Sequence, residues 1–121
     1  MFVPENILIR ISRKLLYRKL FMFSMSDIDV GIIKNMIDCS LKIEQFISDF
    51  HSYLEFENDI KTSDAVLMNL IVIGEQSAKL STQFKKNYNR IPWKNIKGLR
   101  NIIAHHYFGV NYENIWKNCN N

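Results

Sequence analysis

The sequence predicts an all-α protein, an up-and-down bundle of four to five helices. Apolar residues recur at intervals of three and four positions over most of the chain, which is the period of a helix buried along one side. Only four Gly and two Pro occur among 121 residues, too few for the turns of a loop-rich or all-β fold. Hydrophobic residues make up 47% and charged residues 23%, a composition that fits one domain with one modest core.

The first 24 residues differ in charge from the rest. They hold five Lys and Arg against a single Glu, which accounts for the whole net charge of +4. Their apolar residues alternate with these cations, as in a basic amphipathic helix that lies on an anionic membrane or on RNA. We therefore expect residues 1–24 to be a leader and residues 25–121 to be the helical domain. The leader is either upstream sequence before a true start at Met25 or an appendage that folds onto the domain or a partner.

The domain itself has no net charge, since residues 25–121 contain 11 basic and 11 acidic residues. Bulk charge therefore gives no support for nucleic-acid binding, although a neutral domain can still bind RNA locally. Cys39 and Cys119 belong to no motif, which indicates reduced thiols in a cytoplasmic protein. No His or Cys cluster has the spacing of a zinc site. No apolar run reaches the roughly 18 residues that a membrane-spanning helix needs.

The first helix of the domain is expected to begin at Ser26 or Asp27, either of which can cap it, and to end by Phe50. Its apolar positions follow at helical spacing. They are Val30, Ile33, Met36, Ile37, Leu41, Phe46 and Ile47. Residues 51–61 form a mixed polar and aromatic connection that can include a short turn of helix, and His51 is interpreted as a solvated loop residue.

The second long helix is expected to be capped by Thr62 or Ser63, with Asp64 favourable in its first turn through the helix dipole. Residues 65–80 are apolar nearly all round, which predicts a central helix.

Small and polar residues interrupt the second half of this helix. Gly74 costs about 1 kcal/mol of helix stability against Ala, and together with Ser77 and Ala78 it leaves a shallow strip where another backbone can approach closely. Glu75 is either a solvated residue or a side chain that faces the motif helix and orients Arg100 or His105.

A short amphipathic segment, residues 81–88, ends in the basic pair Lys85 and Lys86, which is either a solvated face or a set of phosphate contacts on a bound strand. Pro92 suits the first position of the next helix, and Gly109 its end. The buried stripe of that helix is expected to consist of Trp93, Ile96, Leu99, Ile103 and His106.

Reactive and polar side chains gather along one side of residues 98–107. On a helical wheel with Arg100 at zero, Ala104, Asn101 and His105 fall at about 40°, 100° and 140°. The small Ala104 leaves room for a molecule to lie across the helix. Tyr107 falls at about 340°, beside Arg100. This side of the helix therefore combines a cation, an amide, an imidazole and a phenol.

Arg100, His105 and Tyr107 have the spacing Arg-x4-His-x-Tyr, and the sequence resembles the HepT-like toxins of the HEPN group of small helical ribonucleases. Three short sequence segments around the motif also match this group. They are Ile73-Gly74-Glu75 upstream, Ile91-Pro92-Trp93-Lys94 before the motif, and Tyr107-Phe108-Gly109-Val110 at its end. The resemblance covers roughly residues 27–116 and implies a HEPN-type bundle.

The resemblance implies a metal-independent endoribonuclease with Arg100 and His105 as catalytic residues and no cofactor. An imidazole exchanges protons near neutral pH and can deprotonate the 2′-hydroxyl of RNA. A guanidinium fork holds a phosphate through two hydrogen bonds. Asn101 would fix the tautomer of His105 or bind a phosphate oxygen, and Tyr107 would bind phosphate or stack on a base. The alternative is an ordinary surface Arg100 and a helix-terminal His105 favoured by the dipole.

The resemblance also implies partners. It implies a homodimer in which two motif helices face each other, and an MntA-like nucleotidyltransferase antitoxin that neutralises this toxin by transferring AMP to Tyr107. An anionic group beside Arg100 would occupy the phosphate site and neutralise its cation. Two alternatives stand beside this toxin–antitoxin interpretation. They are a non-catalytic helical module that binds a nucleotidyltransferase, and an inactive truncated relic.

The relic alternative arises from the last helix. Asn111 is expected to cap a helix that contains Tyr112, Ile115 and Trp116, and residues 117–121 then form a polar stub. The family resemblance implies a helix several turns longer, so we expect the last helix to be truncated and the core to be less covered.

Overall fold

The computed structural model describes residues 25–120, and within this range every regular element is helical. The elements are α2 (Asp27–Ile47), α3 (Tyr53–Asn58), α4 (Ile60–Lys79), α5 (Thr82–Asn87), α6 (Trp93–His105), the 3-10 helix η1 (Tyr107–Gly109) and α7 (Tyr112–Asn120). The all-α prediction is confirmed, and a six-residue helix, α3, stands in the expected connection. The predicted leader lies outside the described residues. None of the described helices is long and apolar enough to cross a lipid bilayer.

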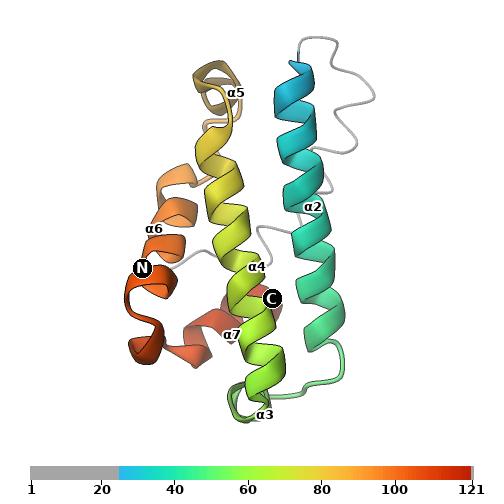
Figure 1. Cartoon of the computed structure of the whole chain (residues 1–121), viewed down its shortest axis with the longest axis vertical. Helices are drawn as coiled ribbons and strands as arrows, with labels where there is room; N and C mark the ends of the chain where they lie inside the picture. Colours follow the sequence, from blue (N-terminus) through green and yellow to red (C-terminus); the bar gives the residue numbers. More distant parts are fainter. Residues whose placement is uncertain (1–24, 121) are drawn as a thin grey trace.

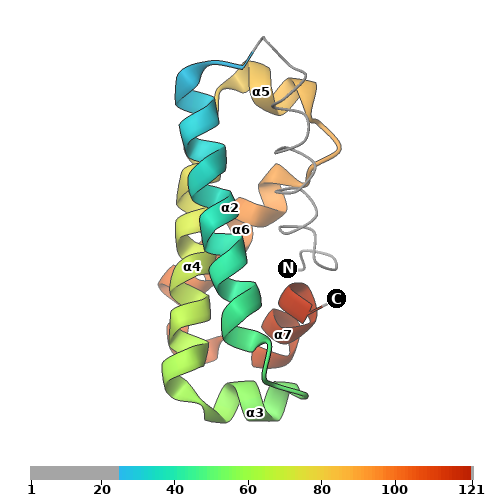
Figure 2. The ribbon, with the colours of Figure 1, turned by 90° about the vertical axis from the view of Figure 1, so that its right-hand side faces the viewer.

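The two longest helices, α2 and α4, run antiparallel, and α4 lies between α2 and α6 (Figure 1). Figure 2 shows α3 at the end of the bundle where α2 leads into α4, with α5 at the opposite end. α7 packs against α3 and α2. The central position of α4 agrees with its nearly all-apolar sequence. One side of it is nevertheless open, because the Met68 side chain is 59% exposed.

Side-chain caps determine where the long helices begin. At the start of α2, the expected cap is present, since Ser26 Oγ accepts a hydrogen bond from the N–H of Asp29 at 3.1 Å. The expected start of α4 is wrong. Asp59 Oδ1 accepts a hydrogen bond from the N–H of Thr62 at 3.0 Å, and the helix begins at Ile60. A carboxylate is preferred over a threonine hydroxyl at this position, so the helix begins about one turn earlier.

The later helices also differ slightly from expectation at their ends. Pro92 precedes α6 rather than forming its first residue, and Trp93 begins the helix. Asn111 caps α7 as expected, because its Oδ1 accepts a hydrogen bond from the N–H of Asn114 at 3.1 Å. The polar end of the chain is not an irregular stub. It continues α7, a short helix of nine residues, and buries Cys119.

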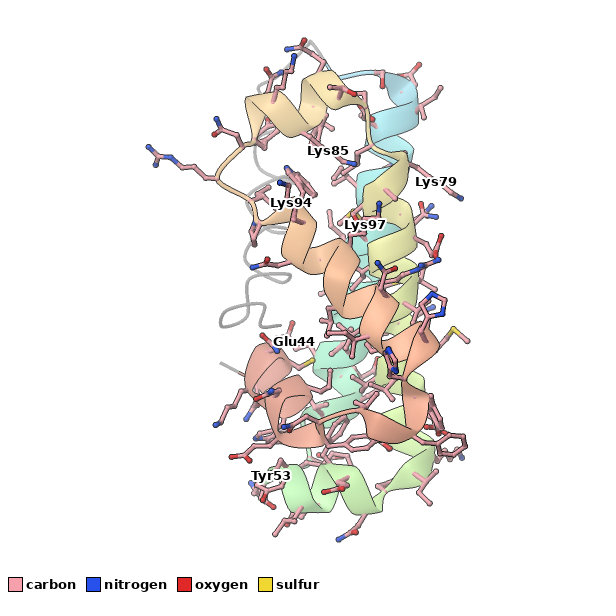
Figure 3. The ribbon with its side chains drawn as sticks, turned by 90° about the vertical axis from the view of Figure 1, so that its left-hand side faces the viewer. Glu44, Tyr53, Lys79, Lys85, Lys94 and Lys97 are labelled. Atoms are coloured by element: carbon pink, nitrogen blue, oxygen red, sulfur yellow. The ribbon has the colours of Figure 1, made fainter. Side chains whose placement is uncertain are left out.

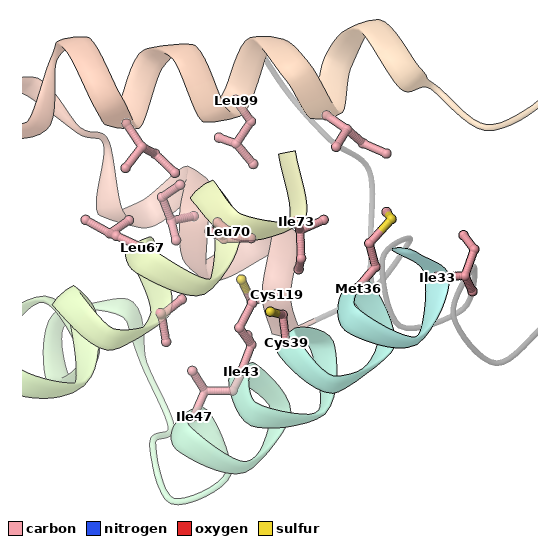
Figure 4. Close-up of a cluster of buried hydrophobic side chains, with 14 of the residues drawn as sticks. Ile33, Met36, Cys39, Ile43, Ile47, Leu67, Leu70, Ile73, Leu99 and Cys119 are labelled. Atoms are coloured by element: carbon pink, nitrogen blue, oxygen red, sulfur yellow. The ribbon is translucent and has the colours of Figure 1, made fainter. Parts of the chain in front are cut away.

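One hydrophobic core joins α2, α4, α6 and α7 (Figure 4). Its members from these four helices include Ile33, Met36, Cys39, Ile43, Ile47, Val66, Leu67, Leu70, Ile73, Ile96, Leu99, Ile103, Ile115 and Trp116. Phe56 of α3 closes one end, with its ring centroid 5.8 Å from that of Trp116 and 6.0 Å from that of Tyr112. α7 therefore covers the lower core despite its short length.

A buried carboxylate joins two elements at the end of the bundle opposite α3. Asp29, an acidic residue in the first turn of α2, is only 4% exposed. It accepts hydrogen bonds from the backbone N–H of Ser81 at 3.0 Å and from the Ser81 hydroxyl at 2.6 Å. Ser81 Oγ also caps α5 by accepting from the N–H of Phe84 at 3.1 Å. This contact fixes the junction between α4 and α5 against the first turn of α2.

Candidate active site

α6 separates an apolar stripe from a polar face. Ile96, Leu99 and Ile103 are buried in the core, as the periodicity predicted. Trp93 is partly buried, and its indole N–H donates a hydrogen bond to the carbonyl oxygen of Tyr88 at 3.2 Å. The remaining surface of the helix carries the predicted site residues. Arg100 lies at the edge of the apolar stripe, and Asn101 and His105 lie farther around the helix.

Arg100 lies directly over Gly74 of α4. A Cβ atom built on Gly74 would be 2.3 Å from Arg100 Cβ, 2.8 Å from Arg100 Cγ and 3.4 Å from the carbonyl oxygen of Ile96. A side chain of any size at this point would push α6 away from α4. The predicted close approach at Gly74 is therefore confirmed, and the helix that approaches is the one that carries the motif.

Two polar groups hold the guanidinium of Arg100. Its Nη2 pairs with Glu75 Oε1, and its Nη1 donates a hydrogen bond to Asn101 Oδ1 at 2.7 Å. The structure therefore has Glu75 facing α6 and paired with Arg100. That Glu75 orients Arg100 for catalysis stays a prediction. The Arg100 side chain is 31% exposed and that of Glu75 is 43% exposed. Solvent reaches the guanidinium, so an incoming anion can reach it too.

His105 is the last residue of α6 and is exposed. Along the helix it lies about 7.5 Å beyond Arg100, and the two residues are about 140° apart around the axis. The amide of Asn101 bonds to Arg100 rather than to His105. Within residues 25–120 the His105 imidazole has no hydrogen-bond partner. The ring is open to solvent and to a bound molecule.

The helix ends before Tyr107, so the predicted position of this residue on the helical wheel is wrong. His106 closes α6 with φ −133° and ψ 42°, and Tyr107 begins η1. The Tyr107 hydroxyl donates a hydrogen bond to Asp64 Oδ1 of α4 at 2.5 Å. That hydrogen bond is the main reason why the pKa of the Tyr107 phenol is raised above its ordinary value.

Asp64 is a site neighbour that the sequence analysis missed, because it was assigned to the first turn of α4. The earlier helix start removes that role. A signal was present in the spacing: Asp64 and Glu75 are 11 residues apart, which is about three helical turns, so they share one face of α4. Both carboxylates on this face contact residues of the motif, Tyr107 and Arg100 respectively.

His106 does not belong to the buried stripe. It was expected to point toward the core, but it is exposed, because the backbone leaves the helix at this residue. Within the described part of the chain, no three His, Cys, Asp or Glu side chains converge in a way that could hold a metal ion. Metal-independent chemistry stays a prediction.

The charges of the domain are divided between its two halves, although they sum to zero. Residues 25–75, which form α2, α3 and most of α4, contain ten acidic and three basic residues. Residues 76–112, which form the end of α4, α5, α6 and η1, contain seven basic residues and no acidic one. The absence of net charge thus concealed a strongly basic segment, and the motif lies within it.

Comparison with known families agrees with this arrangement. The sequence model of the family described as "Ribonuclease HepT-like" matches residues 36–121. This range is most of the chain and contains α4, α6 and the motif. The chain therefore belongs to the HepT-like ribonuclease family.

Named relatives support the same assignment. A "Putative RNase" of Methanocaldococcus jannaschii is 44% identical over 85 residues, which cover 70% of this chain and 66% of the relative. A second "Putative RNase" of the same organism is 35% identical over 94 residues, which cover 77% of this chain and 85% of the relative. A "Probable ribonuclease HepT" of Thermococcus cleftensis is 36% identical over 75 residues, or 62% of this chain and 67% of the relative. No solved structure matches the chain significantly.

Proposed function

We propose that this protein is a metal-independent endoribonuclease in which Arg100 and His105 perform the chemistry. The observation that carries the proposal is the anchoring of Arg100 by Glu75 of α4 and Asn101 of α6. The same helix, α6, presents His105, whose imidazole has no partner among residues 25–120. Membership of the HepT-like ribonuclease family supports the same reaction class.

The proposed reaction is cleavage of RNA by its own 2′-hydroxyl. His105 takes the proton from this hydroxyl, and the 2′-oxygen attacks the adjacent phosphorus. A bond from the 2′-oxygen to phosphorus forms, and the bond from phosphorus to the 5′-oxygen breaks. The departing 5′-oxygen takes up a proton from water, and the proton held by His105 is released to solvent, so the products are a 2′,3′-cyclic phosphate and a 5′-hydroxyl. Arg100 donates hydrogen bonds to the non-bridging oxygens, whose charge grows in the transition state. Glu75 and Asn101 keep the guanidinium in place while it does so.

A homodimer is part of the proposal. Met68 is 59% exposed on the helix that forms the centre of the bundle. It lies on the same face of α4 as Glu75, seven residues or about two turns away. A second copy on this face would cover the open side of α4 and place two sets of Arg100 and His105 near each other. Light scattering on the full chain measures the dimer, and Met68→Glu is expected to dissociate it.

The proposed biological role is that of the toxin in a toxin–antitoxin pair, with Tyr107 as the acceptor of AMP from a nucleotidyltransferase antitoxin. The Tyr107 side chain is 39% exposed, so an enzyme can reach its hydroxyl. A phosphate on this hydroxyl would lie close to the Asp64 carboxylate and would have to break the hydrogen bond between them. Incubation with a cognate nucleotidyltransferase and ATP tests this role by a mass increase that Tyr107→Phe abolishes.

The cleavage experiment uses the full chain, a fluorescent single-stranded RNA and a buffer with excess EDTA. Arg100→Ala and His105→Ala are each expected to lower the cleavage rate at least 100-fold, the scale expected for loss of a general base or an oxyanion donor. His106→Ala is the matched control, since it removes the neighbouring exposed imidazole and is expected to cleave normally.

Equal loss in His106→Ala and His105→Ala would contradict the assignment of the base. Wild-type protein that binds a nucleotidyltransferase but cleaves no RNA would favour the alternative of a non-catalytic module. The packing of α7 through Cys119 supports a folded scaffold rather than a relic.

A further inference from the structure

The distribution of charge points to a site that the motif does not include. Lys79 ends α4, Lys85 lies on α5, and Lys94 and Lys97 lie on α6. Figure 3 shows these four side chains on one face of the molecule, where the three helices meet. We call them the basic track. No acidic residue occurs between positions 76 and 112. The positive charge of the basic track is therefore not neutralised by any side chain of this segment.

The basic track continues into the proposed active site. Lys94, Lys97 and Arg100 follow at intervals of three residues, which places successive side chains within about 60° of each other around α6 and about 4.5 Å apart along it. Lys94 and Lys97 are exposed, and neither makes an ion pair within residues 25–120. A polyanion on these lysines would therefore reach the Arg100 guanidinium without leaving the helix.

An aromatic residue lies beyond the opposite end of the motif. Phe108 of η1 is 100% exposed, and its ring centroid is 5.1 Å from that of the partly exposed Tyr107. The Phe108 ring is not packed in the core, so a role in folding does not explain an aromatic residue at this position. Exposed aromatic rings next to a cationic groove are the usual means by which proteins hold unpaired bases, since every base has a face that can stack.

We propose that the basic track and Phe108 together bind single-stranded RNA across the active site. The lysines contact backbone phosphates on one side of the scissile phosphate, and Phe108 stacks on a base on the other side. This inference rests on the proposed function, because it concerns the substrate of the same site. An acidic protein would satisfy the lysines but would have no use for a stacking ring, so the combination favours a single nucleic-acid strand over a protein partner.

The test is binding, so it does not require cleavage. The full chain is titrated against a fluorescent single-stranded RNA of about 12 nucleotides, within the range of a single binding site, with 2′-O-methyl groups that block the reaction. The track variant is Lys79→Gln/Lys94→Gln/Lys97→Gln. The matched control is Lys34→Gln/Lys42→Gln/Lys61→Gln, which removes three equally exposed lysines from the acidic half.

The salt dependence gives the expected size of the effect. Each phosphate contact on a single strand contributes about 0.7 to the slope of log affinity against log salt. With four track lysines and Arg100 in contact, a fourfold rise in salt weakens wild-type binding about 130-fold. With three lysines removed, the same rise weakens binding only about 7-fold. The control variant is expected to behave as wild type.

Phe108 is tested on the same probe and on its duplex. Phe108→Ala is expected to weaken binding of the single strand by about 5-fold or more and to leave duplex binding unchanged, because paired bases offer no free face. Phe46→Ala removes a partly exposed ring, 37% exposed, from α2 and is expected to change neither.

Three results would overturn the proposal. The first is an unchanged salt slope in the track variant, and the second is an equal loss of slope in the control variant. The third is a track variant that still binds RNA but no longer binds polyglutamate. That result would assign the lysines to an acidic protein partner. Cleavage of unmodified RNA separates this inference from the proposed function. Cleavage that depends on His105 but not on the track would refute the track alone, whereas track-dependent binding without any cleavage would refute the proposed function alone.

Discussion

Replacement of Gly74 by alanine tests whether the packing of α4 on α6 positions Arg100, the arginine of the proposed active site. The added Cβ would be 2.3 Å from Arg100 Cβ, whereas carbon atoms in ordinary contact are about 3.5 Å apart. The first atoms of the Arg100 side chain cannot move without their backbone, so α6 has to shift by roughly the difference, about 1.2 Å at this point.

Two opposing terms decide the effect on stability. Insertion of a methyl group into a tight contact lowers the free energy of unfolding by about 1 to 3 kcal/mol. Alanine in place of glycine inside a helix raises it by about 1 kcal/mol. We therefore expect Gly74→Ala to lower the free energy of unfolding by at most about 2 kcal/mol. If Arg100 acts as proposed, we expect a larger effect on cleavage, since misplacement of a catalytic group by about 1 Å can cost about 100-fold in rate.

Gly31→Ala is the matched control. Gly31 also lies inside a helix, α2, but a Cβ atom built on it meets nothing within 4 Å. This variant is expected to be more stable by about 1 kcal/mol and fully active. The measurements are urea unfolding followed by circular dichroism and cleavage of a fluorescent RNA. A Gly74→Ala protein that matches Gly31→Ala in both stability and activity would refute the reasoning.

Three further predictions concern other contacts. Asp29→Ala removes two hydrogen bonds from a buried carboxylate to Ser81 and is expected to lower the free energy of unfolding by about 2 to 4 kcal/mol; urea unfolding measures it, and a change below about 0.5 kcal/mol would contradict it. Asp64→Asn removes the carboxylate that raises the pKa of Tyr107, so this pKa should fall toward its ordinary value, as measured by phenolate absorbance relative to Tyr107→Phe. Burial raises the pKa of the Cys119 thiol to about 12 from 9.0; the thiol ionises first in the unfolded chain, so stability is lost as pH rises from 9 to 12, by up to about 1.4 kcal/mol per pH unit. Cys119→Ala should remove that part of the slope, and identical slopes in the two proteins would count against it.

The sequence predicted the helices well because their signals are local. Apolar periodicity identified the buried stripe of α6, and the hydroxyl of Ser26 marked the start of α2. The errors came where two local signals competed. Both Asp59 and Thr62 can cap a helix, and the stronger cap determined the start of α4. At the end of α6, nothing in the sequence before Gly109 indicated that the helix stops at His105.

The candidate site was predicted only in part, for a physical reason. A helical wheel gives the neighbours of a residue within one helix, so it identified Arg100, Asn101 and His105 as one face. It gives no information about the helix packed alongside. The pairing of Arg100 with Glu75 was left open, and the contact of Tyr107 with Asp64 was missed. Both depend on the register of α4 against α6, which Gly74 fixes.

The same register connects the fold to the site. Gly74 allows α6 to approach, and the adjacent residue, Glu75, then meets the guanidinium that this approach brings over α4. The ion pair is exposed to solvent, and such pairs contribute less than about 1 kcal/mol to stability. We therefore expect the pair to act through the orientation of Arg100 rather than through stability. If so, Glu75→Gln should keep the wild-type melting temperature and lose cleavage activity, a separation that a purely structural role for Glu75 would not produce.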